Sequence, residues 1–261
     1  MNERIVVQVE DAIATIVFNR SQVLNALDDQ MILAFRAACE RVGADEAIRC
    51  VVVRGDGPAF LAGGDVAMFA AHVDELPRLS LALARELHAG ILALRRMPKP
   101  VIASVHGAVA GAGVSIMAAC DLALAADDAR FTAAYSAIGV SPDGGASYFL
   151  SRCMGPRRAL EFLLLTEPVD AAAALGLGLV NRVVPAAELV AVTQRLARRL
   201  ACGPTRAYAE TKRLIDDAAD APLERQLDAE ALAFSRCAGS DDMREGIAAF
   251  VAKRRPTFMG R

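Results

Sequence analysis

The 261-residue chain contains no tryptophan and only three histidines, His72, His88 and His106. The histidines show no metal-ligand spacing with one another, and none of the six cysteines forms a C-x-x-C pair. These absences argue against a zinc site and a disulfide framework. We therefore expect no bound metal, and reduced, buried thiols in a cytoplasmic protein. His88 lies within an amphipathic helical pattern, which indicates an ordinary, partly exposed residue.

Neither sign of charge predominates, because 29 lysines and arginines stand against 31 aspartates and glutamates, a net charge of −2. Such a chain has no overall field to hold nucleic acid or an anionic membrane, so we expect neither as a partner. The long apolar run at 101–126 contains His106 and Asp121, which favours buried strands and a helix over a membrane span. The first ten residues carry charges within their apolar run, which predicts no secretory signal.

Apolar periodicity predicts the first elements of the chain. Alternation at 5–9 and 13–17 indicates a β-hairpin, and Asp28 is expected to cap a helix that ends at Gly43. The buried face of this helix should consist of Met31, Ile32, Phe35, Ala38, Cys39 and Val42. Further strands are expected at 50–54, 101–104, 122–125 and near 131, with helices at 79–96 and 111–119.

The order of these elements predicts an α/β fold of repeated β-β-α units. From residue 186 onward almost every segment is helical, with helices expected at 189–201, 204–217, 222–237 and 241–253. We therefore divide the chain into an α/β core, residues 1–200, and a helical region, residues 201–261.

Common cofactor and nucleophile motifs are incomplete. Residues 111–116 begin like a dinucleotide-binding G-x-G-x-x-G, but Ile116 stands where the third glycine belongs. No G-x-x-x-x-G-K-[ST] sequence occurs, and the segment 113–117 lacks the closing glycine of a nucleophile elbow. We expect no cofactor.

Two glycine-rich turns each join a strand to the segment that follows it. FLAGGD occupies 60–65 after the strand at 50–54, and HGAVAGAG occupies 106–113 after the strand at 101–104 and opens a helix. Backbone N–H groups at a helix start have no intrahelical partner and carry the positive end of the helix dipole. Two such turns side by side would form an oxyanion hole.

Further motifs accompany these turns in order along the chain. They are Asn19-Arg20 with Asn25-Ala26-Leu27, the two glycine turns, Pro142-Asp143-Gly144-Gly145, and Glu245 to Phe250 followed by Lys253-Arg254. Together they resemble the crotonase, or enoyl-CoA hydratase/isomerase, superfamily over essentially the whole chain. The resemblance implies a spiral of β-β-α units, a C-terminal helical trimerisation region, and homotrimers or dimers of trimers. It also implies chemistry on acyl-CoA thioesters through a stabilised enolate.

The resemblance assigns roles to individual residues. The oxyanion hole should consist of the N–H groups of Gly64 and Ala112. The residues expected to bind the coenzyme A part of the substrate are Arg20, Ala26, Ala62, Gly63 and Lys253. Those expected to line the acyl pocket are Met68, Ser115, Tyr135, Phe234 and Phe250, some of them from a neighbouring subunit.

The acids of the site depart from the hydratase pattern. Where similar hydratases carry two glutamates that activate water, this chain has Ser115 and Tyr135, neither of which is a general base near neutral pH. Asp143 instead stands in a position where hydratases carry glycine. An acid there resembles the ring 1,2-epoxyphenylacetyl-CoA isomerases and the dienoyl-CoA isomerases. We therefore predict an isomerase with Asp143 as proton shuttle, against the alternative that Asp143 only caps a helix after Gly144.

Other functions remain open at this point. An enoyl-CoA hydratase is the first alternative. An aryl-CoA dehalogenase would use Asp143 as a nucleophile aided by a tryptophan and a histidine, but Tyr135 stands at the tryptophan position. A serine hydrolase would pair Ser115 with His106, and a non-catalytic acyl-CoA binder would need neither. The acyl group is not predicted, beyond an apolar pocket wall from residues 66–90.

Overall fold

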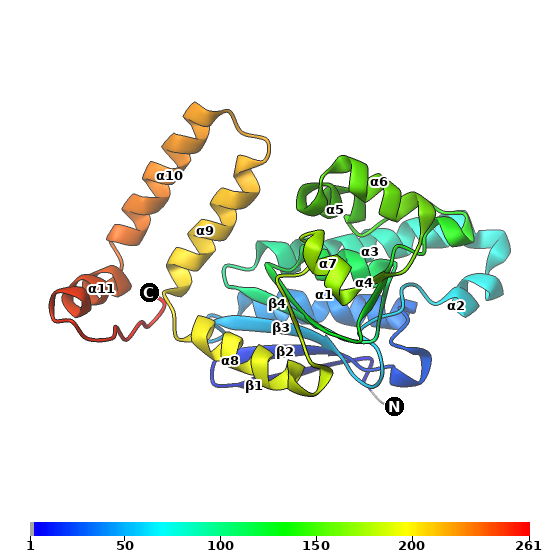
Figure 1. The fold of residues 1–261 in the computed structure, drawn as a ribbon, viewed down its shortest axis with the longest axis horizontal. Helices are drawn as coiled ribbons and strands as arrows, with labels where there is room; N and C mark the ends of the chain where they lie inside the picture. Colours follow the sequence, from blue (N-terminus) through cyan, green and yellow to red (C-terminus); the bar gives the residue numbers. More distant parts are fainter. Residues whose placement is uncertain (1–2) are drawn as a thin grey trace.

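The computed structural model describes residues 3–261, which form two β-sheets with helices around them (Figure 1). The six-stranded sheet has the order β1-β2-β3-β4-β6-β9, and the three-stranded sheet has the order β5-β7-β8. The strands of the large sheet are β1 (Ile5–Glu10), β2 (Ile13–Phe18), β3 (Cys50–Gly55), β4 (Val101–Val105), β6 (Leu122–Ala126) and β9 (Arg182–Val184). Those of the small sheet are β5 (Ala108–Ala110), β7 (Arg130–Thr132) and β8 (Val169–Asp170).

The predicted hairpin is confirmed as β1 and β2, which pair antiparallel. Asp11 and Ala12 connect them with φ values of 48° and 62°, the left-handed backbone that two-residue hairpin turns use. The other neighbours in the large sheet are parallel.

The chain repeats a strand of the large sheet, a short strand of the small sheet, and a helix. One such unit is β4, β5 and α4 (Ala112–Ala119), and the next is β6, β7 and α5 (Ala146–Met154). The predicted α/β spiral of β-β-α units is therefore confirmed. Because each unit carries the chain from one sheet to the other, the loops between the sheets meet along one edge.

Helices cover both faces of the large sheet. α1 (Asp29–Ala44) and α3 (Leu76–Arg96) pack on the face to which Val51 and Val53 point, whereas α8 (Leu189–Ala201) packs on the face of Cys50 and Val52. The predicted cap of α1 is present, because Asp28 Oδ1 accepts the Met31 N–H at 2.8 Å. The six residues predicted for its buried face are the buried ones, and the helix continues one residue beyond Gly43.

The remaining helices of the core are short. They are α2 (Val66–Ala71), α6 (Pro156–Leu165) and α7 (Ala171–Gly176), with 3-10 turns at Ser21–Val23, Val73–Glu75, Ser136–Ile138 and Ala186–Glu188. Within residues 3–261, no helix has the length and apolar character to cross a membrane. All six cysteines are free, but only Cys39, Cys50 and Cys120 are buried. The expectation of buried thiols is wrong for Cys153 and Cys202, which are exposed, and for Cys237, which is partly exposed.

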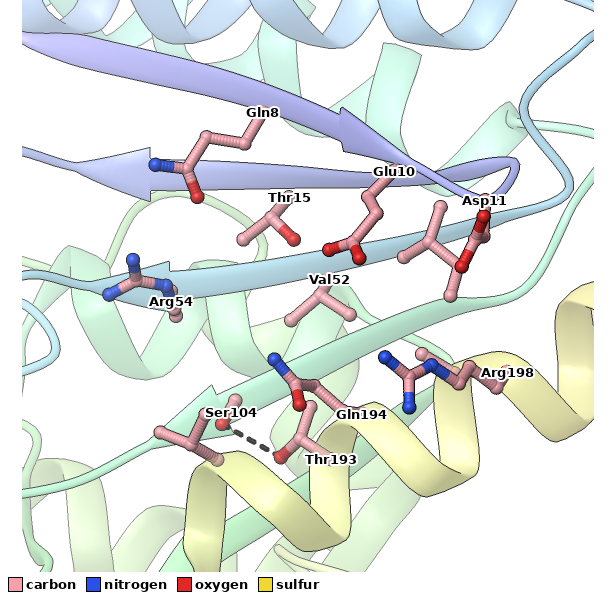
Figure 2. A pocket seen from close by; sticks show the side chains of 13 residues that line it. Gln8, Glu10, Asp11, Thr15, Val52, Arg54, Ser104, Thr193, Gln194 and Arg198 are labelled. Carbon is pink, nitrogen blue, oxygen red and sulfur yellow. Dashed lines mark hydrogen bonds between the residues drawn. The ribbon is translucent and has the colours of Figure 1, made fainter.

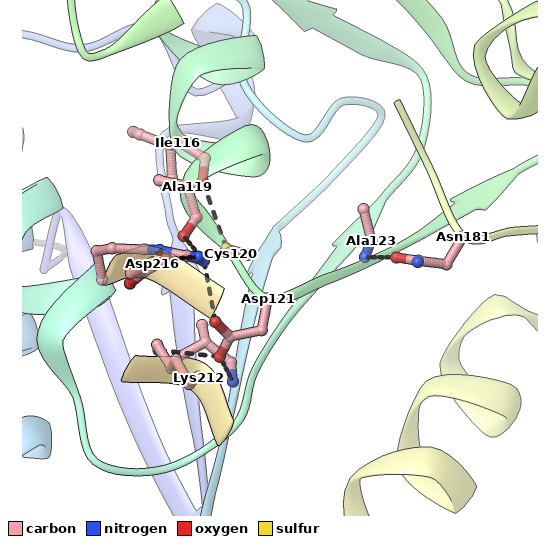
Figure 3. Close-up of polar contacts among 10 residues, drawn as sticks. Ile116, Ala119, Cys120, Asp121, Ala123, Asn181, Lys212 and Asp216 are labelled. Carbon is pink, nitrogen blue, oxygen red and sulfur yellow. Dashed lines mark hydrogen bonds and ion pairs between the residues drawn. The ribbon is translucent and has the colours of Figure 1, made fainter. Parts of the chain in front are cut away.

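The last three helices form an arm that projects away from the two sheets (Figure 1). They are α9 (Thr205–Ala218), α10 (Leu223–Ala238) and α11 (Asp241–Val251). Ion pairs attach α9 to the core (Figure 3): Lys212 Nζ lies 2.9 Å from Asp121 Oδ2, and Arg95 bridges Asp121 and Asp216. The arm exposes the apolar side chains of Leu223, Leu227, Leu232, Phe234, Ile247, Phe250 and Val251.

Candidate active site

The two glycine-rich turns lie against each other at the edge between the sheets. Leu61 N–H donates to Ala108 O at 3.2 Å, and Ala110 N–H donates to Leu61 O at 2.9 Å, so a short parallel bridge joins the turns. A Cβ atom on Gly113 would lie 2.4 Å from Leu61 O, closer than real contacts allow. A glycine at 113 is therefore required for this approach.

Gly63 and Gly111 make the second contact between the turns. Their φ values are 98° and 50°, which favour glycine, and a Cβ on Gly111 would lie 3.5 Å from Gly63 Cα. The juxtaposition that the sequence analysis expected is thus present in the structure.

Each turn presents one N–H on a fixed peptide. Gly63 O accepts the Leu27 N–H at 2.8 Å, so the N–H of Gly64, on the same planar peptide, points away from Leu27. Gly111 O accepts from the first turn of α4, so the Ala112 N–H points out of the helix start. Within the described part of the chain, neither N–H donates a hydrogen bond. Two such donors on touching turns can hold an oxygen that gains negative charge.

Asn25 holds the segment that leads into the first turn. Its buried side chain donates to the carbonyls of Asp56, Ala59 and Phe60, and its Oδ1 accepts the Arg20 N–H at 2.8 Å. Asn25 itself has a φ of 59°, which an asparagine tolerates better than most residues. Sequence reasoning quoted Asn25 only as part of a motif, without this role.

Arg20, which was predicted to bind the coenzyme A part of the substrate, forms ion pairs within the chain. Its guanidinium is buried, lies 3.0 Å from Asp65 Oδ2 and 3.4 Å from Asp28 Oδ2, and donates to Ala26 O. Ala62, also predicted to bind coenzyme A, donates its N–H to the Leu24 carbonyl at 3.0 Å. The positive charge of Arg20 is therefore engaged by two carboxylates within the chain. These contacts give Arg20 a structural place beside the first turn and lend no support to a phosphate-binding role.

The structure brings together Ser115, Tyr135 and Asp143, three of the predicted site residues. Tyr135 Oη donates to Asp143 Oδ1 at 3.0 Å and lies 2.8 Å from Ser115 Oγ, which donates to the Asp143 carbonyl at 3.0 Å. Ser115 lies on α4 three residues after Ala112, so the two share one side of the helix. The Asp143 cluster, which we define as Ser115, Tyr135 and Asp143, is thus one helical turn from a candidate oxyanion donor.

Only Asp143 in this cluster is suited to take a proton. Burial, and then the neighbouring Asp143 carboxylate, raise the pKa of Tyr135 well above its ordinary value, so the phenol keeps its proton and donates. The alternative that Asp143 caps a helix is wrong. The residue at the start of α5 is Gly145, without a side-chain cap, and in residues 3–261 the Asp143 carboxylate accepts only from Tyr135.

Two histidines lie in places that the sequence did not indicate. His88 is exposed as predicted, but its Nε2 accepts the Gly144 N–H at 3.0 Å, beside Asp143. His106 Nε2 lies 2.8 Å from Gly57 O, whereas Ser115 is bonded within the Asp143 cluster. The alternative of a Ser115–His106 hydrolase pair is therefore wrong.

The predicted pocket residues divide into two groups. Met68 is half-buried on α2, directly after the first turn, and the neighbouring Phe69, which sequence reasoning missed, packs its ring against Gly64. Phe234 and Phe250 are 70% and 85% exposed on α10 and α11, and Lys253 follows on the same arm. A single chain does not bring the arm residues to the turns (Figure 1), so their assignment stays a prediction.

A cavity lies elsewhere, between the large sheet and α8 (Figure 2). It has a volume of about 270 Å³ and is lined by apolar side chains together with polar and charged ones, including Glu10, Arg54 and Arg198. It contains none of the predicted site residues. Among residues 3–261, no group of three histidine, cysteine, aspartate or glutamate side chains has the arrangement of a metal site.

Comparison with known proteins gives the same family from three directions. The model of the family described as "Enoyl-CoA hydratase/isomerase" matches residues 8–261. The chain is 36% identical to 1,2-epoxyphenylacetyl-CoA isomerase of Escherichia coli over 100% of both chains. It is 35% identical to a probable enoyl-CoA hydratase of Rhodobacter capsulatus over 97% of both. A crystal structure of a putative enoyl-CoA hydratase/isomerase from Mycobacterium abscessus superposes with a TM-score of 0.95 at 34% identity, covering 98% of this chain and 100% of that one. The chain therefore belongs to the enoyl-CoA hydratase/isomerase, or crotonase, family.

Proposed function

We propose that this enzyme is an acyl-CoA isomerase that moves a double bond or opens a ring epoxide through a thioester enolate. The observation that carries the proposal is the Asp143 cluster. Its carboxylate is the one group there able to accept a proton. By the family resemblance, Ser115 and Tyr135 stand where hydratases carry the two glutamates that activate water. The likeness to an isomerase that acts on 1,2-epoxyphenylacetyl-CoA supports the same reaction class.

The proposed reaction needs one base and one oxyanion hole. The thioester carbonyl oxygen accepts from the Gly64 and Ala112 N–H groups, each of which contributes about 3–4 kcal/mol to the transition state. Asp143 removes a proton beside the thioester and returns it to another carbon or to the opened epoxide oxygen. Tyr135 holds Oδ1 of Asp143, which leaves Oδ2 to carry the proton. Coenzyme A is part of the substrate, and no separate cofactor takes part.

The proposal also covers how copies of the chain assemble through the arm. Residues 201–261 would form the trimerisation region of a homotrimer or a dimer of trimers, and a neighbouring copy would supply Phe234, Phe250 and Lys253 to the acyl-CoA site. The exposure of both phenylalanines in a single chain supports this, because large apolar side chains so exposed are unfavourable in water.

Substitution of the aspartate is the direct test. Asp143→Asn keeps the shape of the side chain but cannot take a proton, so turnover of 3-enoyl-CoA and exchange of substrate protons with deuterium oxide should fall roughly 10²- to 10⁴-fold. Acyl-CoA binding, measured by calorimetry, should persist. Ser115→Ala and Tyr135→Phe, the matched controls in the same cluster, should cost much less.

The hydratase alternative gives the opposite result. Hydration needs two carboxylates to hold and activate one water, and the Asp143 cluster contains one. The wild type should therefore hydrate crotonyl-CoA poorly. Rapid hydration of crotonyl-CoA that survives Asp143→Asn would overturn the isomerase proposal.

A further inference from the structure

The peptide between Asp143 and Gly144 is held at both of its polar atoms. Its carbonyl oxygen accepts from Ser115 Oγ at 3.0 Å, from Tyr135 Oη at 3.3 Å and from the Ala146 N–H at 3.0 Å, while its N–H donates to His88 Nε2 at 3.0 Å. A peptide is planar, so contacts at opposite ends fix its rotation. The direction of the Asp143 side chain depends on this peptide, because both begin at the same Cα atom.

His88 is the contact that α3 contributes. Ile91 lies three residues further on, on the same side of the helix, and a Cβ on Gly144 would lie 3.3 Å from its Cδ1 and 2.8 Å from Ser115 Cβ. α3 and α4 thus pack against Gly144 from two sides. The His88 ring does not fill space in the core, since it is exposed, so its contribution here is the hydrogen bond.

The segment needs such a contact because its own backbone is permissive. Gly144 and Gly145 have φ values of 60° and 82°, and glycine moves between many backbone conformations at little cost. Without an acceptor for the Gly144 N–H, the peptide is held only at its carbonyl end, so its N–H end can tilt and shift the Asp143 carboxylate. An accepting Nε2 also requires a neutral ring with its proton on Nδ1.

We propose that His88 is a positioning residue that orients the Asp143 carboxylate through the Asp143–Gly144 peptide. The inference rests on the proposed function, because it assigns the contact a purpose in proton transfer by Asp143. Small displacements of a reacting group from its productive position lower the rate far more than they lower binding. His88 therefore acts on the chemical step and not on acyl-CoA affinity.

A comparison of two amide variants, His88→Gln and His88→Asn, tests the inference. The His88→Gln side chain places its oxygen near the position of Nε2, whereas the shorter His88→Asn side chain cannot reach Gly144. His88→Asn should lower kcat for 3-enoyl-CoA isomerisation and deuterium exchange roughly 10- to 100-fold, with KM changed less than about threefold. His88→Gln should recover most of the loss. Unchanged kcat in His88→Asn, equal losses in both variants, or an effect confined to KM would overturn the inference.

A spectroscopic measurement separates this inference from the proposed function. The sequence contains two Asp-Gly pairs, Asp56–Gly57 and Asp143–Gly144, so ¹⁵N-glycine with ¹³C-carbonyl aspartate marks only two amides. His88→Asn should shift the Gly144 amide and leave Gly57 in place, and His88→Gln should restore it. A wild type without isomerisation or proton exchange would refute the proposed function on its own. A Gly144 amide that stays in place in His88→Asn would refute the positioning role.

Discussion

Gly113 is the residue at which the two glycine turns approach each other most closely. In Gly113→Ala the new Cβ would lie 2.4 Å from Leu61 O, so the turns must separate and the N–H groups of Gly64 and Ala112 must move apart. We expect a loss of about 1–3 kcal/mol in unfolding free energy, and a decrease in isomerase activity of roughly 100-fold or more.

Gly176→Ala is the matched control, because no atom lies within 4 Å of a Cβ at that position. Thermal unfolding and isomerisation rates of the two variants provide the comparison. A Gly113→Ala enzyme with the stability and activity of Gly176→Ala would contradict the required contact between the turns.

At the scale of single residues, the sequence predicted which residues form the site better than it predicted their hydrogen-bond partners. Family resemblance assigned Ser115, Tyr135 and Asp143 to one site. The hydrogen bonds among them were not predicted, because they join residues 8 to 28 positions apart and sequence periodicity does not record such contacts. Arg20 was expected to bind coenzyme A, and its ion pair with Asp65 was not predicted because the two residues lie 45 positions apart. His88 was missed because its partner is a backbone N–H, which no side-chain motif records.

At the scale of elements, the attachment of α9 depends on a small network of charges. Asp121 accepts from Lys212, Arg95 and the Val101 N–H, and it is largely buried. Lys212→Met removes one partner from a buried acceptor, so we expect a loss of about 1–3 kcal/mol in unfolding free energy and faster proteolysis of the arm. Arg213→Met, which breaks exposed pairs on the same helix, should cost about 1 kcal/mol or less.

The same network sets a pH dependence. Burial raises the pKa of Asp121 in the folded chain, against the opposing effect of Lys212 and Arg95. A folded pKa above the unfolded value means that this contribution to stability is full below about pH 4 and declines as the pH rises through the folded pKa. Lys212→Met should make the decline steeper in urea unfolding between pH 4 and 8. Parallel pH profiles for the variant and the wild type would contradict the assignment.

Long periodic elements were predicted well, and short ones were not. The buried face of α1 and the bounds of α8 agree residue for residue with the apolar spacing, because several turns of a helix repeat the pattern. α2 spans six residues, Val66–Ala71, and all six side chains are apolar. A uniform run of this kind has no periodicity, so only its capping residue, Asp65, marks its start.

At the scale of the whole molecule, the arm is the part that a single chain leaves incomplete. Its exposed leucines and phenylalanines lie on α10 and α11, beyond the packing between α9 and the core. We expect sedimentation to give three or six times the chain mass of 27.5 kDa. Deletion of residues 204–261 should yield insoluble or unfolded protein. A soluble, active monomer from that deletion would contradict the assembly proposed for the arm.

The bridge between Leu61 and Val109 has a consequence for how such an enzyme changes over generations. It is built from main-chain atoms, so mutations that exchange side chains away from the glycines of the two turns leave the Gly64 and Ala112 amides where they are. Under the proposed function, the groups that select a reaction come instead from separate segments, the loop of Asp143 and the short helix α2. A lineage can therefore acquire a new reaction by altering a few side chains, while the two main-chain amides that would hold the oxyanion are inherited unchanged.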